Sequence, residues 1–243
     1  MRILIVNPNT TASMTAKIGA AGQAAAAPGT EVAAVSPDKG PVSIEGYYDE
    51  AFCVPGTIER VRQGAAEGFD GFVLACFDDP GLDACRTAVD RPVVGICEAA
   101  MHTVSLIAGS FSVVSTLARS IPLIEGLALR YGMERRLCRV RAADVPVLAL
   151  EKPGGDAAQR VRAEVLLAAR EDRAEAVLLG CAGMADLAAW LTRETGVPVL
   201  DGVACAVKQV EALVGLGLTT SKIGAYAAPR PKPYTGAFSV YGV

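Results

Sequence analysis

Short apolar runs, often rich in β-branched residues, alternate along the chain with longer amphipathic stretches. The short runs predict strands, because each is about as long as a buried strand. The longer stretches, such as residues 156–175, carry apolar residues at spacings of three and four, which is typical of helices. The predicted strands lie at residues 2–6, 31–35, 71–75, 92–96, 111–115, 139–143, 176–180 and 198–202. This alternation predicts an α/β fold with mostly parallel sheets that are covered on both faces.

An internal repeat divides this pattern into two similar halves. The segment RPVVGICEAAMHTVSLIAGS at 91–110 aligns with VPVLDGVACAVKQVEALVGL at 197–216, so that a proline, a strand and a helix match at an offset of 106 residues. RILIVNPNT at the start likewise matches FSVVSTLAR at 111–119. We therefore predict two α/β lobes of like construction, related by approximate two-fold symmetry.

Two of the seven cysteines occupy equivalent positions in these halves. Cys76 ends the run FVLAC, Cys181 ends VLLGC, and the two are 105 residues apart. Because ligands of parallel α/β sheets bind beyond the carboxyl ends of the strands, facing lobes would bring both thiols to opposite walls of one cleft. The unmatched cysteines are expected to be packing residues; these are Cys53, Cys85, Cys97, Cys138 and Cys205.

Two opposed thiols suit the inversion of a stereocentre beside a carbonyl group. A base on one face removes the proton, while an acid on the other face delivers one. A thiol pKa of about 8.5, lowered by nearby donors, makes thiolate and thiol both accessible near neutral pH. The enolate oxygen needs hydrogen-bond donors already in place. The candidates are Asn9, Thr10, Ser115, Thr116 and the backbone N–H groups of Phe77, Asp78, Ala182 and Gly183. Helix capping is the alternative role for the Asn, Ser and Thr side chains.

Composition and charge exclude several other classes of protein. The 243 residues are 51% hydrophobic with a net charge of −3, which is typical of a soluble protein with a large core. Scattered Lys and Arg residues argue against a nucleic-acid partner. The apolar runs fall short of the roughly 18 residues of a membrane span. The start MRILIVNPNT has no secretory-signal pattern, so a cytoplasmic protein with free thiols is expected.

Metal and cofactor chemistry have little support in the sequence. The sequence has no C-x-x-C pair and a single histidine, His102, so a zinc site is not expected. That histidine lies in the apolar, helix-like segment AAMHTVSLIAG, which favours packing over a role as partner of a nucleophilic cysteine. No pyridoxal phosphate signature occurs, and GLGLTTSKIG lacks the spacing of a phosphate loop. We therefore predict that no cofactor is needed.

Five motifs in order resemble the hydantoin racemase family within the aspartate/glutamate racemase superfamily, and the similarity covers essentially the whole chain. They are VNPNTT (6–11), GPVSIEGYYDEA (40–51), ACFDDPGLDA (75–84), LGCAGM (179–184) and GLTTSKIGAYAAP (217–229). The resemblance implies two pseudo-symmetric Rossmann-like domains with the active site in the cleft between them. Residues 1–97 plus 209–243 would form a discontinuous first domain, and residues 98–208 the second.

The resemblance also implies the reaction and the residues of the site. It implies cofactor-independent inversion at C5 of 5-substituted hydantoins, by a two-base mechanism in a homo-oligomer. Cys76 and Cys181 match the two catalytic cysteines of the family. Substrate-binding positions are expected at Asn9, Ile44, Phe77, Ser115, Thr116, Ala182 and Gly183.

One residue departs from the family pattern. Glycine is usual after the cysteine-aromatic pair, whereas this chain has Asp78 there. A carboxylate at this position would raise the pKa of Cys76 by like-charge repulsion, or would bind an N–H group of the substrate. Substrate range, and which thiol is ionised at rest, therefore stay open.

Several alternative functions share parts of this pattern. Relatives that racemise allantoin, a hydantoin with a ureido substituent, share the motifs, so allantoin is an alternative substrate. Decarboxylases of the superfamily keep only one of the two cysteines, and maleate isomerases use a cysteine to add to a double bond. A non-catalytic small-molecule binding protein with two lobes is the alternative from a different class. Possession of both thiols favours the racemase.

Overall fold

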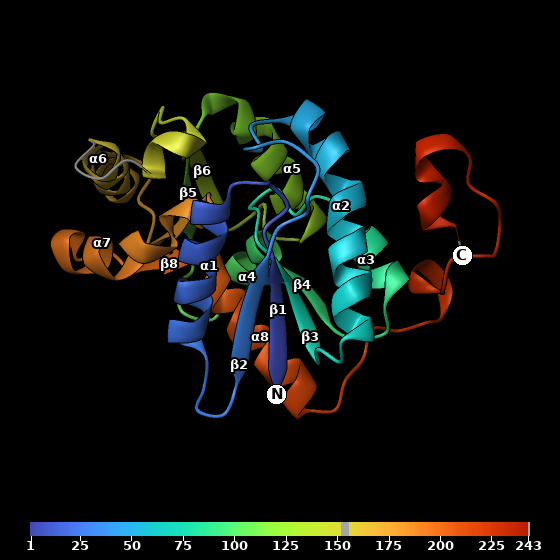
Figure 1. Ribbon diagram of the computed structural model, residues 1–243. Helices are drawn as coiled ribbons and strands as arrows, with labels where there is room; N and C mark the ends of the chain where they lie inside the picture. Colours follow the sequence, from blue (N-terminus) through green and yellow to red (C-terminus); the bar gives the residue numbers. More distant parts are fainter. Residues whose placement is uncertain (152–155, 243) are drawn as a thin grey trace.

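Each half of the chain forms its own four-stranded parallel sheet (Figure 1). The computed structural model describes residues 1–151 and 156–242. The order is β2-β1-β3-β4 in the first sheet and β6-β5-β7-β8 in the second, so the same order occurs twice. The strands are β1 (Arg2–Val6), β2 (Glu31–Val35), β3 (Gly71–Leu74), β4 (Val93–Gly95), β5 (Phe111–Ser115), β6 (Leu137–Ala142), β7 (Ala176–Leu179) and β8 (Val199–Asp201). The predicted α/β class and its internal repeat are confirmed.

Helices follow the strands and cover the sheets, as the 3.6-residue periodicity predicts. The α-helices are α1 (Ala12–Ala25), α2 (Tyr47–Ala66), α3 (Leu82–Ala88), α4 (Ile96–Val104), α5 (Ile121–Arg130), α6 (Ala157–Glu171), α7 (Ala188–Thr195) and α8 (Gly202–Gly215). Short 3₁₀ helices are η1 (Ala118–Ser120), η2 (Val147–Glu151), η3 (Ala182–Leu187), η4 (Gly224–Tyr226) and η5 (Gly236–Tyr241). Among the described residues, no helix has both the length and the apolar character that a membrane span requires.

Strands β1, β3, β4, β5 and β7 are buried on both faces, which explains why they read as continuous apolar runs rather than alternating ones, whereas the edge strands β2 and β6 are partly exposed. In β1, Ile3 and Ile5 pack in one hydrophobic cluster with α1 and α8, whereas Leu4 and Val6 pack in another with α2 and α3. Each buried side chain of this size contributes about 1.5–3 kcal/mol to stability. The second sheet repeats the arrangement, with α6 and α7 over one face and α4 and α5 over the other.

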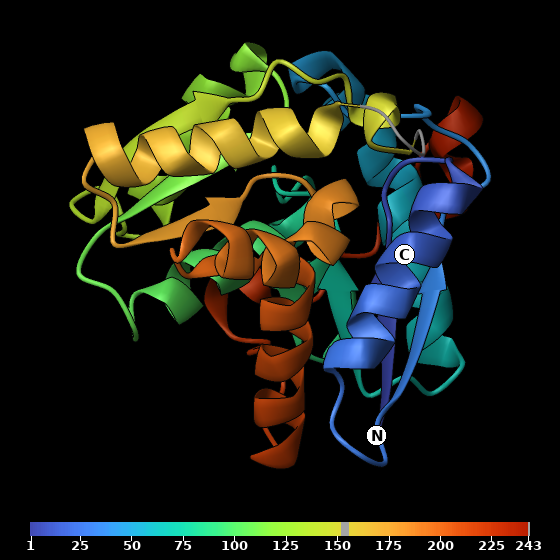
Figure 2. The ribbon, with the colours of Figure 1, turned by 90° about the vertical axis from the view of Figure 1, so that its left-hand side faces the viewer.

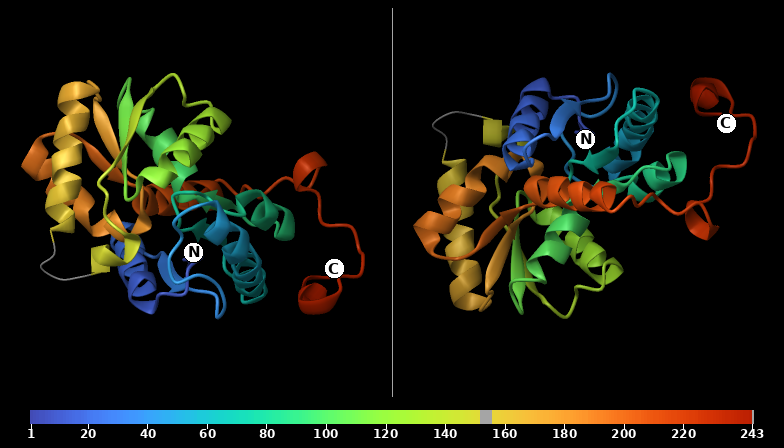
Figure 3. Two further views of the ribbon diagram at one scale, coloured as in Figure 1. Left: turned by 90° about the horizontal axis from the view of Figure 1, so that it is seen from above. Right: turned by 90° about the horizontal axis from the view of Figure 1, so that it is seen from below.

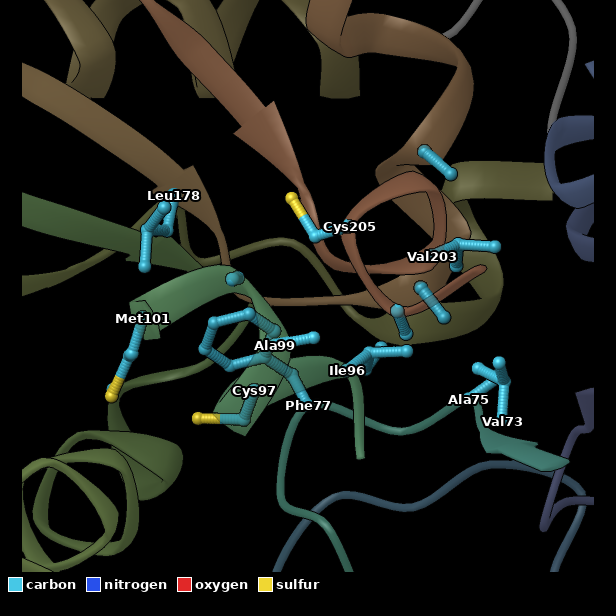
Figure 4. Packing of buried hydrophobic residues seen from close by; sticks show 14 of the residues in the cluster. Val73, Ala75, Phe77, Ile96, Cys97, Ala99, Met101, Leu178, Val203 and Cys205 are labelled. Atoms are coloured by element: carbon cyan, nitrogen blue, oxygen red, sulfur yellow. The ribbon is translucent and has the colours of Figure 1, made fainter. Parts of the chain in front are cut away.

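The largest hydrophobic cluster joins the two halves. It contains residues of both sheets together with α1, α4, α5 and α8. Figure 4 shows its centre, where Ile96, Cys97 and Ala99 of α4 gather with Val203 and Cys205 of α8. Helices α1 and α8 lie side by side in Figure 2. The facing sheets are therefore held in one fixed relation by a shared core.

The first residues of α4 and α8 approach each other closely across the two halves. Gly202 begins α8, and Ile96 begins α4 at the equivalent position of the repeat. A Cβ atom added at Gly202 would lie 2.5 Å from the carbonyl oxygen of Ile96, closer than such atoms approach in proteins. Glycine is therefore required at this point because the two helices meet there.

The C-terminal segment returns to the first half. The backbone N–H of Thr220 donates to the carbonyl of Asp90 at 2.7 Å, and the Tyr226 hydroxyl donates to Asp83 at 2.9 Å. Beyond these contacts the segment extends outward and then turns back beside α2, where Tyr241 of η5 lines a groove together with Arg62 (Figures 1 and 3). The division into 1–97 plus 209–243 and 98–208 stays a prediction. Its boundaries fall inside α4 and α8, and residue 243 lies outside the described residues.

Candidate active site

The loops that carry the two matched cysteines have the same local geometry. Each strand adds one hydrogen bond beyond its end, from Ala75 N–H to Val6 O at 2.9 Å and from Gly180 N–H to Val114 O at 2.8 Å. The next residue is the cysteine, whose carbonyl accepts from the residue three positions later at 3.1 Å in both loops. The sequence repeat is thus a repeat of backbone shape, and the carboxyl ends of β3 and β7 present their thiols in the same way.

Both thiols line one pocket at the carboxyl ends of the two sheets. The pocket encloses about 400 Å³ of space, including its open mouth. Its lining combines polar and apolar side chains from both halves of the chain, and Cys76 and Cys181 each keep partial access to it. The lining residues are Asn9, Met14, Ile44, Ala75, Cys76, Phe77, Asp78, Thr116, Ser120, Val147, Gly180, Cys181 and Ala182.

Most of the substrate-binding positions expected from the sequence lie in this lining. The exceptions are Ser115 and Gly183. Ser115 is the last residue of β5, and its hydroxyl donates to the carbonyl of Gly180 at 3.4 Å instead of facing the pocket. Gly183 directs its backbone N–H toward the sulfur of Cys181. The roles of all these residues in binding stay predictions.

The Asn9 side chain is fixed by a hydrogen-bond network before α1. Its Oδ1 accepts from Asn7 Nδ2 at 3.0 Å and from the backbone N–H of Thr11 at 2.9 Å, and its Nδ2 lies 3.2 Å from the sulfur of Met14. Thr11 is the N-cap of α1, and its side chain makes no capping hydrogen bond. Asn9 therefore acts two residues before the cap, where it holds the loop that enters the pocket.

From the sequence we expected nearby donors to lower the pKa of the two thiols, and this expectation is wrong for the unliganded protein, because burial raises the pKa of both. The pKa of Cys76 lies well above its ordinary value, because burial and the charge of Asp78 outweigh the backbone N–H of Asp78 that donates toward the sulfur. Burial also raises the pKa of Cys181, to about 11, although the N–H of Gly183 and the charge of Lys17 act in the opposite direction. Each sulfur thus has a backbone donor two residues ahead, at equivalent positions. The charge of Asp78 raises the pKa of both thiols, whereas the charge of Lys17 lowers that of Cys181.

Two consecutive aspartates after Cys76 have different surroundings. Asp79 caps α4, accepting from the N–H groups of Cys97 at 3.1 Å and Glu98 at 2.9 Å and from the hydroxyl of Tyr131 at 2.8 Å. Gly95 leaves room for this carboxylate, since a Cβ there would lie 2.3 Å from its Cγ. Asp78 faces the pocket. Its pKa is raised to about 7, mainly by burial and to a smaller extent by the charges of Glu50 and Asp79.

Some residues around the pocket could not be found by motif. Met14, Ser120 and Val147 come from α1, η1 and η2, where the sequence gives only ordinary helical patterns. Lys17 of α1 donates to the carbonyls of Leu150 and Gly183, both at 3.3 Å, which links the two halves beside Cys181. The signal that identified Asp78 was its departure from the glycine that the resemblance implies at this position.

Comparisons with known proteins agree with this arrangement. The family model for Asp/Glu/Hydantoin racemase matches residues 3–210. The hydantoin racemase of Rhizobium meliloti is 50% identical over 97% of this chain and 98% of its own length. Among solved structures, the allantoin racemase from Klebsiella pneumoniae is 48% identical, covers 100% of this chain and 99% of its own, and has a TM-score of 0.97. The allantoin racemase from Pseudomonas fluorescens is 42% identical over 97% of this chain and 100% of its own, with a TM-score of 0.93. The chain therefore belongs to the Asp/Glu/hydantoin racemase family.

Proposed function

We propose that this protein racemises 5-substituted hydantoins at C5 without a cofactor, using Cys76 and Cys181 as the two acid/base groups. The observation that carries the proposal is the pair of thiols, which follow equivalent strands of two facing sheets and line the same pocket. They are close enough for the charge of one to raise the pKa of the other. The names of the similar proteins supply the substrate class, hydantoins including allantoin.

The proposed reaction moves one proton off C5 and another onto it. The thiolate on one face takes the C5 proton, and the electron pair of that C–H bond moves into the adjacent carbonyl to give an enolate. The thiol on the opposite face then protonates C5, the enolate collapses to the carbonyl, and the product has inverted configuration. The second sulfur is left as the thiolate, so the reverse reaction starts from the other wall of the pocket.

Hydroxyl groups in the pocket are suited to hold the enolate oxygen. Thr116 and Ser120 line the pocket, and only 4% and 6% of their surface is exposed. Within the part of the chain that the structure describes, neither hydroxyl has a hydrogen-bond partner. Donors already in place near a developing negative charge stabilise it more effectively than water does. We assign Thr116 and Ser120 to this role.

The charges around the pocket favour Cys181 as the thiol that ionises first. Lys17 lowers the pKa of Cys181, and no cation acts in this way on Cys76 among the described residues. Asp78 is the largest charge acting on Cys76 and raises its pKa. Asp78 also raises the pKa of Cys181, but there the charge of Lys17 acts against it. We therefore assign the first ionisation in the unliganded enzyme to Cys181, on the wall formed by the second sheet.

The test combines isotope exchange with polarimetry. A single enantiomer of a 5-substituted hydantoin is incubated in heavy water, and the wild type is expected to incorporate deuterium at C5 while optical rotation decays to zero. Cys76→Ser and Cys181→Ser should each lose roughly 10²- to 10⁴-fold in racemisation, because one face then lacks a competent acid or base. Cys138→Ser is the matched control, since that cysteine is exposed and outside the pocket.

The outcome separates the proposal from its rivals. If Cys76→Ser and Cys181→Ser each racemised both enantiomers at the wild-type rate, the two-thiol mechanism would be refuted. A non-catalytic binding protein would bind the hydantoin without incorporating deuterium above the buffer rate. A decarboxylase would leave the enantiomer unchanged and release carbon dioxide from a malonate-type substrate.

A further inference from the structure

Two carboxyl groups beside the proposed catalytic thiols lack the partners that buried carboxyls normally have. Asp78 lines the pocket and is 9% exposed. Its side chain makes no hydrogen bond or ion pair with any residue in the described ranges 1–151 and 156–242. Glu50, in the first turn of α2, has a fully buried Oε1 that also lacks a hydrogen-bond partner within those ranges.

The charge of Glu50 acts on Asp78. After burial, the charge of Glu50 is the largest influence on Asp78 and raises its pKa. Asp79, which is adjacent in sequence, adds to the increase but is itself satisfied by α4 and Tyr131. No basic residue in the described part of the chain compensates Asp78. Lys17, the cation of the pocket, acts on Cys181.

A buried carboxyl group without a donor is costly, and native proteins rarely leave one in that state. Such a group at a pocket surface is satisfied when a ligand brings N–H donors to it. The rest of the lining near these thiols includes apolar side chains, namely Met14, Ile44, Phe77 and Val147. A purely apolar substituent would displace water from the carboxyl pair and give it no donor in return, whereas a substituent with N–H groups would satisfy it.

We infer that Asp78, backed by Glu50, binds the N–H groups of the C5 substituent, so that the enzyme favours hydantoins with a ureido or similar donor-bearing substituent over those with an alkyl one. This inference rests on the proposed racemase function. A site built to accept hydrogen bonds discriminates strongly against analogues that lack the donors, because its own polar groups are then left unpaired. The loss of one hydrogen bond to a charged group corresponds to roughly a 10- to 100-fold change in kcat/KM.

The test compares two substrates in matched variants. kcat/KM is measured for allantoin and for 5-isopropylhydantoin with wild type, Asp78→Gly and Asp78→Asn. Asp78→Gly should lower the ratio of the allantoin value to the 5-isopropylhydantoin value by roughly 10- to 100-fold. The loss of its charge beside Cys76 acts with both substrates and cancels in this ratio. The glycine variant is expected to fold, because the Asp78 side chain has no hydrogen bond to lose among the described residues. Glu134→Gln, on the exposed surface, is the control for removal of a carboxylate.

Two outcomes would overturn the inference. If kcat/KM of Asp78→Gly falls equally with both substrates, Asp78 contacts the hydantoin ring rather than the C5 substituent. If kcat/KM falls with neither substrate, Asp78 does not bind substrate. Calorimetric titration of wild type and Asp78→Gly with the same two compounds gives a second readout that does not depend on turnover. If wild type binds allantoin more tightly than 5-isopropylhydantoin and Asp78→Gly abolishes that preference, the binding role of Asp78 is supported even if the protein does not racemise either compound. If wild type binds the two compounds with equal affinity, the inference is wrong.

Discussion

Asp78→Asn is expected to stabilise the folded protein, and to do so only above acidic pH. In the folded state burial, with the charges of Glu50 and Asp79, raises the pKa of Asp78 from 3.8 to about 7. The unfolded chain ionises this carboxyl near its ordinary value, so the folded state favours the protonated form. Asparagine has nearly the same shape and never ionises. The variant therefore avoids the cost of a buried, unpaired charge.

The magnitude follows from the pKa difference. Each pKa unit corresponds to 1.36 kcal/mol, so a shift of about three units costs the wild type ~4 kcal/mol when the carboxyl is fully ionised. The sign follows from the raised folded-state pKa. Below about pH 4 the carboxyl is protonated in both states, and wild type and variant should be equally stable. Between about pH 4 and 7 wild-type stability should fall relative to the variant, and above pH 7 the difference should level off.

Urea denaturation at several pH values, followed by circular dichroism, measures this difference directly. Glu50 and Asp79 are present in both proteins, so the comparison isolates Asp78. Asp38→Asn is a suitable control, because that exposed aspartate pairs with Arg60 at the surface and its removal should cost less than about 1 kcal/mol. A difference between wild type and Asp78→Asn that stays constant from pH 4 to 8 would refute the reasoning.

Three further predictions concern other buried groups. In the unliganded protein, iodoacetamide should modify the exposed Cys138 well before Cys181. Because the pKa of Cys181 is raised to about 11, the rate at which Cys181 is alkylated should rise about tenfold per pH unit from pH 7 to 10. Equal alkylation rates of the two cysteines at pH 7 would contradict this prediction. Tyr131→Phe should lower the free energy of unfolding at pH 8 by about 1.5–3 kcal/mol, because the Asp79 carboxylate, which caps α4, loses the Tyr131 hydroxyl as a donor. Urea denaturation measures this difference, and an unchanged midpoint would contradict the prediction. Asp172→Ala should lower the free energy of unfolding by about 1.5–3 kcal/mol, because Arg141 loses its two hydrogen bonds to Asp172, at 2.6 and 2.7 Å, and keeps only Glu164 and Glu171. Chemical denaturation at pH 7 measures the loss, and a loss below about 0.5 kcal/mol would contradict the prediction.

The fold was predictable from the sequence because its determinants are local. Buried parallel strands produce short apolar runs, and all eight predicted runs coincide with strands. The repeat at 91–110 and 197–216 marks α4 and α8, which pack together at the centre. The matched positions of Cys76 and Cys181 indicated one shared pocket, and the structure places both in it.

The rest of the site could not be predicted because it depends on which helix faces meet across the halves. Lys17 looks like any charged residue of an amphipathic helix, yet its amine reaches the carbonyl of Gly183, far away in the sequence. Glu50 sits in a motif of the resemblance, but nothing in the motif indicates that its carboxyl is buried without a partner. Ser115 has the residue type expected of a ligand contact, and its strand geometry turns the hydroxyl toward Gly180 instead.

The contact between Gly202 and Ile96 has a consequence for the spacing of the two sulfur atoms. These residues begin the helices that directly follow β4 and β8, the strands adjacent to those carrying the thiols. A single methyl group at Gly202 must push one helix start away from the other, since the obstructing atoms belong to the backbone of Ile96. The two walls would then separate without any change in the reacting groups. In the proposed mechanism, the absence of a side chain at Gly202 thus helps to set the spacing between the two sulfur atoms.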